Sequence, residues 1–214
     1  MTFKIFTLNI NFKKLTKERI ERIIALIRKH NPDIIFLQEV PREMVELFLQ
    51  MEEYRYHFGT IFTHPYDTII LSRFPCIRYD RIPLCDTVMG RGFLLAQIRL
   101  PSGQIIFVGT FHLDSVFSPP QSELIKMDQL LLIQSILKGK TFVIGGDTNL
   151  LDNVQTAFPS LKELDSLATF KNNRFDRFFT SNDLTNSTAQ VIGDPTHSDH
   201  YGLFEQFEFK QLAQ

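Results

Sequence analysis

The chain has 214 residues, 43% of them hydrophobic, which is enough apolar material for one large core or at most two small domains. Its 23 Lys and Arg residues are balanced by 24 Asp and Glu residues, so the formal net charge is −1. A protein that wraps nucleic acid over its whole surface is usually basic, so this balance does not indicate such a role, but it allows a local groove for the end of a nucleic acid.

The sequence contains no sign of secretion or of a membrane span. The apolar segment 1–10 is too short for a signal peptide and lacks a small-residue cleavage site. Cys76 and Cys85 are too few for a disulfide framework, and no zinc-binding pattern surrounds them. We therefore expect an intracellular protein of the cytoplasm or nucleus that is monomeric and not attached to a membrane.

Strands and helices alternate in the first quarter of the chain. Residues 3–10 form an apolar run that predicts a strand, and residues 16–30 predict a helix because Ile20, Ile23, Ile24 and Ile27 share one helical face. Pro32 follows the end of this helix, as expected for a helix stop. Residues 33–39 then predict a buried strand that ends in polar groups, and residues 42–51 predict a second helix.

The rest of the chain is richer in strands. Strands are predicted at residues 68–72, 93–100 and 104–110, and the segment Pro101-Ser-Gly103 predicts a hairpin turn between the last two. A helix is predicted over residues 121–137, followed by strands at 141–145, 175–180 and 201–209. Because no linker or repeat divides the sequence, we expect a single α/β (α+β) domain over residues 1–214, with two packed sheets and helices outside.

Acidic and amide side chains follow the strand at 141–145. Asp147 and Asn149 stand two residues apart in the segment Gly146-Asp-Thr-Asn-Leu150, so in an extended chain they would point the same way. Two such oxygen-bearing groups suit a hard metal ion or a water that attacks phosphorus. The same pattern is also typical of a simple turn, since both residue types favour turns.

Similar polar groups lie at the ends of other predicted strands. Each has an ordinary structural interpretation, such as a turn residue, a core histidine or the first solvated side chain of a loop. Taken together, however, they are of the metal-ligand and acid–base type, and they recur at strand ends. The candidates are Asn9, Glu39, His112, Ser115, Asp176, Asp199 and His200.

In order and type, these segments resemble the endonuclease/exonuclease/phosphatase superfamily. The resemblance runs through Asn9, Leu37-Gln-Glu39, His112-Leu-Asp-Ser115, Gly146-Asp-Thr-Asn149 and Ser198-Asp-His200, and so covers nearly the whole chain. It implies a four-layer αββα sandwich of two packed mixed β-sheets flanked by helices. It also implies a Mg²⁺-dependent phosphodiesterase site, with Mn²⁺ as a substitute, at one end of the sheets.

Within the superfamily, the motifs are most similar to the tyrosyl-DNA phosphodiesterase 2 family. Gly146-Asp-Thr-Asn-Leu150 matches that family's segment, Arg174-Phe-Asp-Arg177 matches its Arg-Phe-Asp-Arg, and Ser198-Asp-His-Tyr-Gly-Leu203 resembles its Ser-Asp-His-Trp-Gly-Leu. This chain departs from the family at Leu151, where an arginine is common, and at Thr169-Phe-Lys171, where the family has Thr-Trp-Asp. These departures bear on how the substrate is held.

The chemistry of phosphodiester hydrolysis suggests a role for each candidate. Glu39 is the first choice as a Mg²⁺ ligand, because Mg²⁺ takes one or two carboxylates and keeps several waters. Asp199 would contact the metal directly or through water. Asn9 would orient Glu39, the attacking water or the phosphate. Asp147 would orient and deprotonate the water, with Asn149 beside it.

Two histidines and a serine are the candidates for binding the phosphate. His112, Ser115 and His200 would contact its non-bridging oxygens as charge develops. The resemblance implies that Asp176 pairs with His200 and holds its ring in one tautomer. Arg91, in Met89-Gly-Arg-Gly92, is a candidate for gripping DNA, although an arginine in a solvated loop is the ordinary interpretation.

The resemblance leads to one main hypothesis and two alternatives. The main hypothesis is a Mg²⁺-dependent hydrolase that cleaves 5′-phosphotyrosyl bonds at DNA ends carrying a tyrosine or peptide adduct, as in the repair of topoisomerase-type damage. The second is another enzyme of the superfamily, such as an abasic-site nuclease, another DNA or RNA nuclease, or a phosphoinositide phosphatase. The third is a non-catalytic binding module that keeps the fold.

Overall fold

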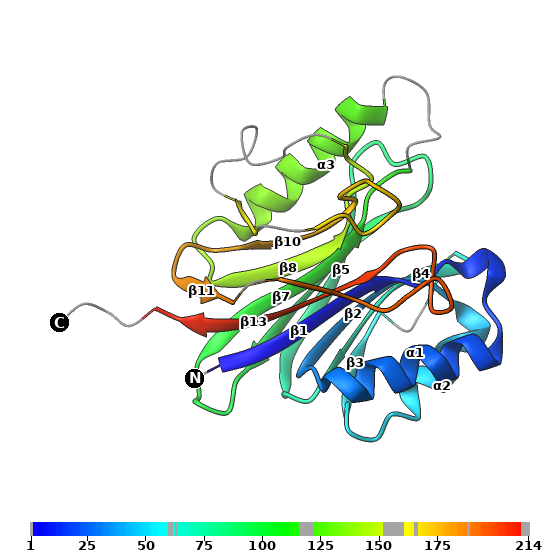
Figure 1. Cartoon of the computed structure of the whole chain (residues 1–214). Coiled ribbons are helices and arrows are strands. Elements are labelled where there is room, and N and C mark those ends of the chain that lie inside the picture. Colours follow the sequence, from blue (N-terminus) through cyan, green and yellow to red (C-terminus); the bar gives the residue numbers. More distant parts are fainter. Residues whose placement is uncertain are drawn as a thin grey trace.

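Two β-sheets pack face to face, with α3 on one outer side and α1 and α2 on the other (Figure 1). This arrangement is seen in a computed structural model, which describes residues 2–59, 62, 64–115, 122–151, 161–164, 167–187 and 189–210. The predicted four-layer α/β architecture is thereby confirmed. None of the helices in these described ranges has the length and apolar character needed to cross a membrane.

The first sheet is built from both ends of the chain. Its seven strands run in the order β11-β13-β1-β2-β4-β3, with β12 also paired to β13. β1 and β2 are parallel, and the other pairs are antiparallel. The strands are β1 (Thr2–Asn9), β2 (Ile34–Pro41), β3 (Tyr56–Phe58), β4 (Tyr66–Ser72), β11 (Leu184–Asn186), β12 (Gln190–Ile192) and β13 (Gly202–Phe209).

The second sheet comes from the middle of the chain. Its six strands run in the order β5-β6-β7-β8-β10-β9, and only β7 and β8 are parallel among the pairs described. The expected hairpin joins β6 to β7, and Gly103 adopts the positive φ of 84° that the turn requires. The strands are β5 (Cys76–Pro83), β6 (Gly92–Arg99), β7 (Ile105–His112), β8 (Phe142–Asp147), β9 (Lys162–Glu163) and β10 (Asp176–Thr180).

Each parallel pair is connected by a helix that crosses the outer face of its sheet. α1 (Lys17–His30) joins β1 to β2, and α3 (Ser122–Leu137) joins β7 to β8. Thr16 caps α1 by accepting a hydrogen bond from the backbone N–H of Arg19. Because both parallel pairs run toward the same end of the molecule, their carboxyl ends meet there (Figure 1).

Three apolar clusters hold the layers together. The central one lies between the sheets and includes Phe36, Val108 and Phe178. The second lies between the first sheet and the helices α1 and α2, and the third lies between the second sheet and α3. The spacing of Ile20, Ile23 and Ile27 therefore predicted the buried face of α1 correctly, since all three are fully buried.

Some predicted elements differ in the structure. The helix predicted over 42–51 is a 3-10 turn, η2 (Arg42–Met44), followed by a short α2 (Val45–Leu49). Five strands were not predicted: β3, β5, β9, β11 and β12. Four of them have only two or three residues, and β5 is an edge strand whose residues are largely exposed, so it lacks a clear apolar pattern. The other predicted helices and strands are confirmed to within two residues at each described end, although residue 121 lies outside the described part.

A buried tyrosine ties the segment after α2 to the start of β2. The hydroxyl of Tyr54 donates a hydrogen bond of 2.7 Å to the backbone oxygen of Pro32, and burial raises the pKa of Tyr54 to about 12. We expect Tyr54→Phe to lower the free energy of unfolding by about 1 kcal/mol at neutral pH, because the carbonyl of Pro32 loses its donor. Urea denaturation measures this difference.

The same tyrosine predicts a pH effect with a definite sign. Because its pKa is raised from 10.0 to about 12 on folding, the stabilisation is complete below pH 10 and is lost as the pH rises toward 12. The wild-type protein should therefore lose more stability than Tyr54→Phe between pH 9 and pH 11 (about the range in which a tyrosine titrates). Equal losses in the two proteins would contradict the prediction.

Candidate active site

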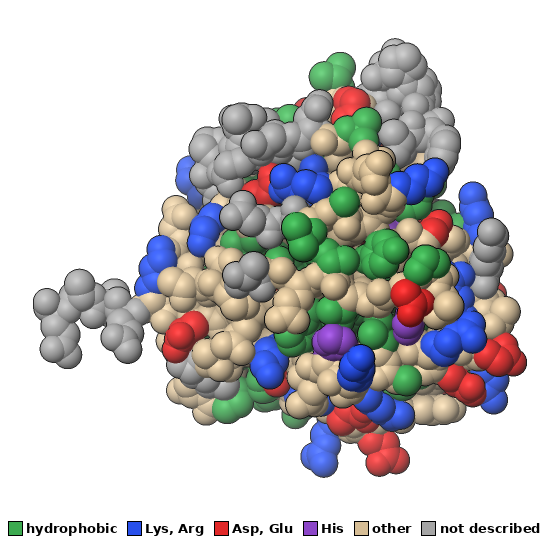
Figure 2. Space-filling view, in the orientation of Figure 1, with side chains coloured by type: hydrophobic (Ala, Val, Ile, Leu, Met, Phe, Trp, Pro, Cys, Tyr) green, Lys and Arg blue, Asp and Glu red, His purple; other side chains and the backbone are tan. Residues whose placement is uncertain are grey.

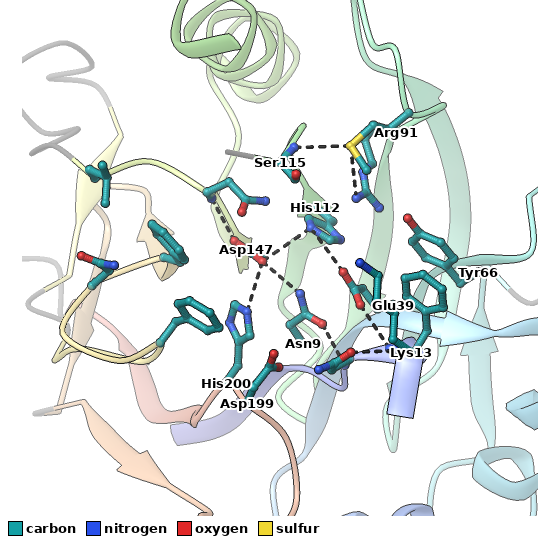
Figure 3. A pocket seen from close by; sticks show the side chains of 18 residues that line it. Asn9, Lys13, Glu39, Tyr66, Arg91, His112, Ser115, Asp147, Asp199 and His200 are labelled. Carbon is teal, nitrogen blue, oxygen red and sulfur yellow. Dashed lines mark hydrogen bonds and ion pairs between the residues drawn. The ribbon is translucent and has the colours of Figure 1, made fainter. Parts of the chain in front are cut away.

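A cavity of about 450 Å³ lies where the carboxyl ends of the two parallel strand pairs meet. Its walls include Asn9 from the end of β1, Glu39 from β2, His112 from the end of β7 and Asp147 from the end of β8. Figure 3 shows that these side chains point toward one another. The polar groups that the sequence placed at separate strand ends therefore share one site.

Asp147 lies at the centre of this group. One carboxylate oxygen, Oδ2, accepts a hydrogen bond of 2.9 Å from Nδ2 of Asn9. The same oxygen lies 3.5 Å from Nε2 of His112 and 3.8 Å from Nε2 of His200. Strand register explains the convergence, since Asp147 pairs with His112 on one side and with Asp176 on the other. Burial raises the pKa of Asp147 above its ordinary value.

His200 and Asp176 form the predicted carboxylate–histidine pair. Nδ1 of His200 lies 2.7 Å from Oδ2 of Asp176, which is fully buried. Burial by itself would lower the pKa of His200, but the charges of Asp176, Asp147 and Asp199 outweigh it and raise the pKa to about 10. His200 is therefore an imidazolium whose Nε2 faces Asp147.

The pKa of His112, in contrast to that of His200, is lowered. It lies near two carboxylates, with Nε2 3.5 Å from Asp147 and 4.0 Å from Oε1 of Glu39. These acids would favour a charged ring, but complete burial and the cations Arg91 and His200 lower its pKa well below 6.5. The burial penalty is the largest of these influences, so His112 is neutral.

Glu39 reaches the cavity because β2 is irregular at this point. The pairing of β2 with β4 shifts register between Leu37 and Val40, and Glu39 has a φ of 58°, which is rare for a residue with a side chain. A bulge of this kind turns a side chain out of the strand's alternation. Oε2 of Glu39 accepts a hydrogen bond of 3.1 Å from the backbone N–H of Phe12.

Asn149 satisfies both interpretations of its motif. Its backbone N–H donates a 2.8 Å hydrogen bond to Oδ1 of Asp147, so the segment is a turn. Its side chain also lines the cavity, where Nδ2 donates to the backbone oxygen of Leu113 at 3.1 Å. The turn therefore orients Asp147 and places Asn149 beside it.

The three remaining candidates also line the cavity. Asp199 is exposed and Ser115 is half-buried. Arg91 is buried, its guanidinium lies 5.4 Å from the ring centre of Tyr66, and its Nε has no hydrogen-bond partner among the described residues. A buried donor without a partner is uncommon in proteins and is suited to binding an anion.

Several lining residues were not predicted from the sequence. Tyr66 opens β4 and pairs with Pro41 at the end of β2, so it lies at the same edge of the sheet as Glu39. Its only local signal is its place two residues before the strand predicted over 68–72, which does not reveal the pairing with β2. Phe12 stacks on Tyr66 with ring centres 4.0 Å apart, but it comes from a 3-10 turn, η1 (Phe12–Lys14), that has no periodic pattern. The other lining residues without a predicted role are Asn11, Lys13, Met89, Leu151, Phe170, Asn173 and Phe175.

Comparison with known proteins agrees with this geometry. A model described as the endonuclease/exonuclease/phosphatase family matches residues 6–200, which include every candidate residue. The chain belongs to the endonuclease/exonuclease/phosphatase family. The resemblance drawn from the motifs is thus confirmed.

Curated relatives of this endonuclease/exonuclease/phosphatase family member carry the name tyrosyl-DNA phosphodiesterase 2. The Xenopus laevis protein is 30% identical over 139 residues, which is 63% of this chain and 37% of the relative. The Homo sapiens protein is 29% identical over 163 residues, covering 72% of this chain and 44% of the relative. The chain spans less than half the length of these curated relatives.

Solved structures share the fold of the endonuclease/exonuclease/phosphatase family. D. rerio tyrosyl-DNA phosphodiesterase 2 complexed with single-strand DNA product has a TM-score of 0.84 at 22% identity, over 97% of this chain and 99% of that chain. The human Nocturnin catalytic domain with bound sulfate has a TM-score of 0.80 at 20% identity, over 98% and 94% of the two chains. These identities establish the fold alone.

Acidic residues in and beside the cavity provide two places where this family member could hold a metal ion. Among the described residues, ligand atoms of Asp147, Asp176 and His200 lie within 4.8 Å of one another, a spacing that could hold a metal. Within this cluster, however, Nδ1 of His200 is already paired with Oδ2 of Asp176 at 2.7 Å, and the donor that remains is a ring nitrogen. Glu39 has a carboxylate oxygen, Oε1, facing the cavity, and its side chain is 17% exposed. The donor chemistry therefore fits a hard cation better at Glu39 than at His200.

Proposed function

We propose that this chain is a Mg²⁺-dependent phosphodiesterase that hydrolyses 5′-phosphotyrosyl bonds at DNA ends, as in the removal of covalent topoisomerase-type adducts during DNA repair. The names of the curated relatives support the proposal. The observation that carries it is the contact of one Asp147 oxygen with Asn9, His112 and His200 in a single cavity. The family match over residues 6–200 further supports a single catalytic domain.

The metal would be held at one side of the cavity. Glu39 is the proposed ligand, and the exposed Asp199 is the second candidate, directly or through water. A bound Mg²⁺ would neutralise charge on the phosphate and so make it more open to attack. Because Mg²⁺ needs only one or two carboxylates besides its waters, these two acids suffice.

Asp147 is the proposed base for the attacking water. Burial raises its pKa, which makes it a stronger proton acceptor than an exposed aspartate. The amide of Asn9 and the turn at Asn149 hold both of its oxygens. The water would lose its proton to Asp147 as its oxygen attacks phosphorus, and the bond from phosphorus to the tyrosine oxygen would break.

The two histidines are proposed to bind the phosphate oxygens in different ways. His200 is charged and is held in place by Asp176, so its Nε2 can donate to an oxygen that becomes more negative. His112 is neutral and can donate from Nε2 while its buried Nδ1 has no partner among the described residues. Together they would stabilise the charge that develops during attack.

The leaving group fits this set of residues. A tyrosine phenol has a pKa of about 10, far below that of a sugar hydroxyl, so it needs less help from an acid. The products would be a 5′-phosphate end and a free tyrosine or peptide.

The surface charge is consistent with binding a DNA end instead of a long duplex. On the face shown in Figure 2, Lys and Arg side chains alternate with Asp and Glu side chains and do not form a continuous basic band. Binding of a long duplex depends on many phosphate contacts. We therefore propose that the DNA contacts lie close to the cavity, with Arg91 and Lys13 as the candidate cations.

An oligonucleotide with a 5′-phosphotyrosyl end tests the proposal. Purified protein with Mg²⁺ should release tyrosine and leave a 5′-phosphate, EDTA should stop the reaction, and excess Mg²⁺ should restore it. We expect Glu39→Gln to lower kcat/KM by about 100-fold or more at fixed Mg²⁺, because a neutral amide binds a hard cation poorly. Gel electrophoresis of the labelled oligonucleotide measures each rate.

A matched variant and a substrate panel make this test decisive. Glu46→Gln changes an exposed glutamate of α2 outside the cavity and should keep wild-type activity. Cleavage of abasic DNA, RNA or a phosphoinositide without any release of tyrosine would overturn the proposed substrate. Equal activity of Glu39→Gln and wild type would overturn the proposed metal ligand.

A further inference from the structure

A buried lysine on α3 reaches the loop that carries Asp147. Lys126 is 0% exposed, which is unusual because lysine is almost never fully buried unless it is paired. Its ammonium contacts Glu123 one turn earlier in α3 and donates a 2.9 Å hydrogen bond to the backbone oxygen of Asn149. The side chain of Glu123 is 47% exposed, so an ion pair with it could form in solvent. The hydrogen bond to the backbone oxygen of Asn149 is therefore the contact that accounts for the burial of the ammonium group.

The loop after β8 is held from two sides by buried cations. From β10, Arg177 donates to the hydroxyl of Thr148 and, at 3.0 Å, to the backbone oxygen of Leu150. From α3, Lys126 holds the neighbouring carbonyl of Asn149. Asn149 has a φ of 51°, in the left-handed region that asparagine adopts more readily than most residues. The two cations therefore hold two successive carbonyls of this turn.

This clamp acts directly on the orientation of Asp147. The backbone N–H of Asn149 donates to Oδ1 of Asp147 at 2.8 Å, and this bond sets the rotation of the carboxylate. With Oδ1 held in this way, Oδ2 faces Asn9 and the two histidines. A rotation of the Asn149 backbone would release Oδ1 and turn the carboxylate away from them.

We propose that Lys126 is a positioning residue for Asp147, acting through the backbone of Asn149. The inference rests on the proposed function for its effect on turnover. Lys126 does not line the cavity, so it would contribute to kcat and have little influence on substrate binding. A cation is suited to this role because it makes a stronger hydrogen bond to a carbonyl than a neutral donor does.

Kinetics of three variants test the proposal. We expect Lys126→Met to lower kcat by roughly 10- to 100-fold with KM nearly unchanged, because a small misplacement of a catalytic group is costly. Lys126→Arg, which keeps a cationic donor, should recover most of the loss. Lys138→Met makes the same change at an exposed lysine just after α3 and should match wild type.

Hydrogen exchange gives a readout that does not depend on the substrate. Amides of the segment 146–151 should exchange about tenfold faster in Lys126→Met than in wild type, with β1 unchanged, since a loosened loop opens locally. Measurement well below the melting temperature of each variant separates this effect from global unfolding. If the wild type cleaves no phosphotyrosyl bond, the proposed function fails and the exchange data decide on Lys126 alone. Unchanged exchange in Lys126→Met, a wild-type kcat, or equal kcat losses in Lys126→Met and Lys126→Arg would overturn the proposal.

Discussion

Asp147→Asn is expected to abolish almost all turnover while leaving the fold intact. The substitution removes the proposed base, which contributes about 10²- to 10⁴-fold to rates in enzymes that use one. The amide has nearly the same shape as the carboxylate. One of the hydrogen bonds from Asn9 and Asn149 is lost, at a cost of about 1 kcal/mol, but a buried charge is also removed. We therefore expect kcat to fall by about 1,000-fold or more and the melting temperature to change by only a few degrees.

The control for Asp147→Asn is the same substitution at an aspartate that lies outside the cavity. Asp80 lies on the exposed edge strand β5, where it pairs with Arg78, and its side chain is 53% exposed. Asp80→Asn should keep wild-type kcat, because exposed ion pairs contribute little and the residue lies outside the cavity. An Asp147→Asn enzyme that retained more than about one tenth of wild-type kcat would rule out the proposed base.

His200→Ala is expected to lose both activity and stability, for separate reasons. Loss of a charged donor to the phosphate should lower kcat by about 100- to 1,000-fold. Asp176 is fully buried and its Oδ1 already lacks a partner in the described structure, so removal of His200 leaves its charge uncompensated. Breaking a buried pair of this kind costs about 3–5 kcal/mol.

A second substitution separates the loss of activity in His200→Ala from its loss of stability. Adding Asp176→Asn to His200→Ala replaces the uncompensated charge with a neutral amide, so the double variant should regain much of the lost stability. Its activity should stay low because the donor is still missing. Chemical denaturation and kinetic assays of the single and double variants measure the two effects. Recovery of activity together with stability would mean that His200 acts only on the fold.

Much of the candidate site could be predicted from the sequence because strand direction is regular. Asn9, His112 and Asp147 each end a strand, and in parallel pairs the carboxyl ends share one edge of the sheet. Motif matches then supplied Asp176 and His200, whose 2.7 Å pair the structure contains. The turn type at Asn149 followed from its residue preference.

Other features of the site depend on geometry that has no local signal. Phe12 and Tyr66 are far apart in the sequence. Their rings stack because β4 pairs with β2 beside the turn η1. The charge states of the two histidines in the site could not be predicted from the sequence either. His112 and His200 share Asp147 as a neighbour, yet their pKa values shift in opposite directions. Burial and the cations Arg91 and His200 lower the pKa of His112, whereas the hydrogen bond to Asp176 and the charges of nearby acids raise that of His200. Such differences arise from burial and three-dimensional neighbours.

The unusual backbone at Glu39 has a consequence for any effort to make this protein more robust. A left-handed conformation costs a residue with a side chain roughly 1–2 kcal/mol, whereas glycine adopts it freely. A substitution chosen only to fit the backbone angles would place glycine at position 39. The Glu39→Gly variant should have a higher melting temperature, but it would lose the carboxylate that is the proposed magnesium ligand. At this position, thermal tolerance and chemistry place opposite demands on a single amino acid.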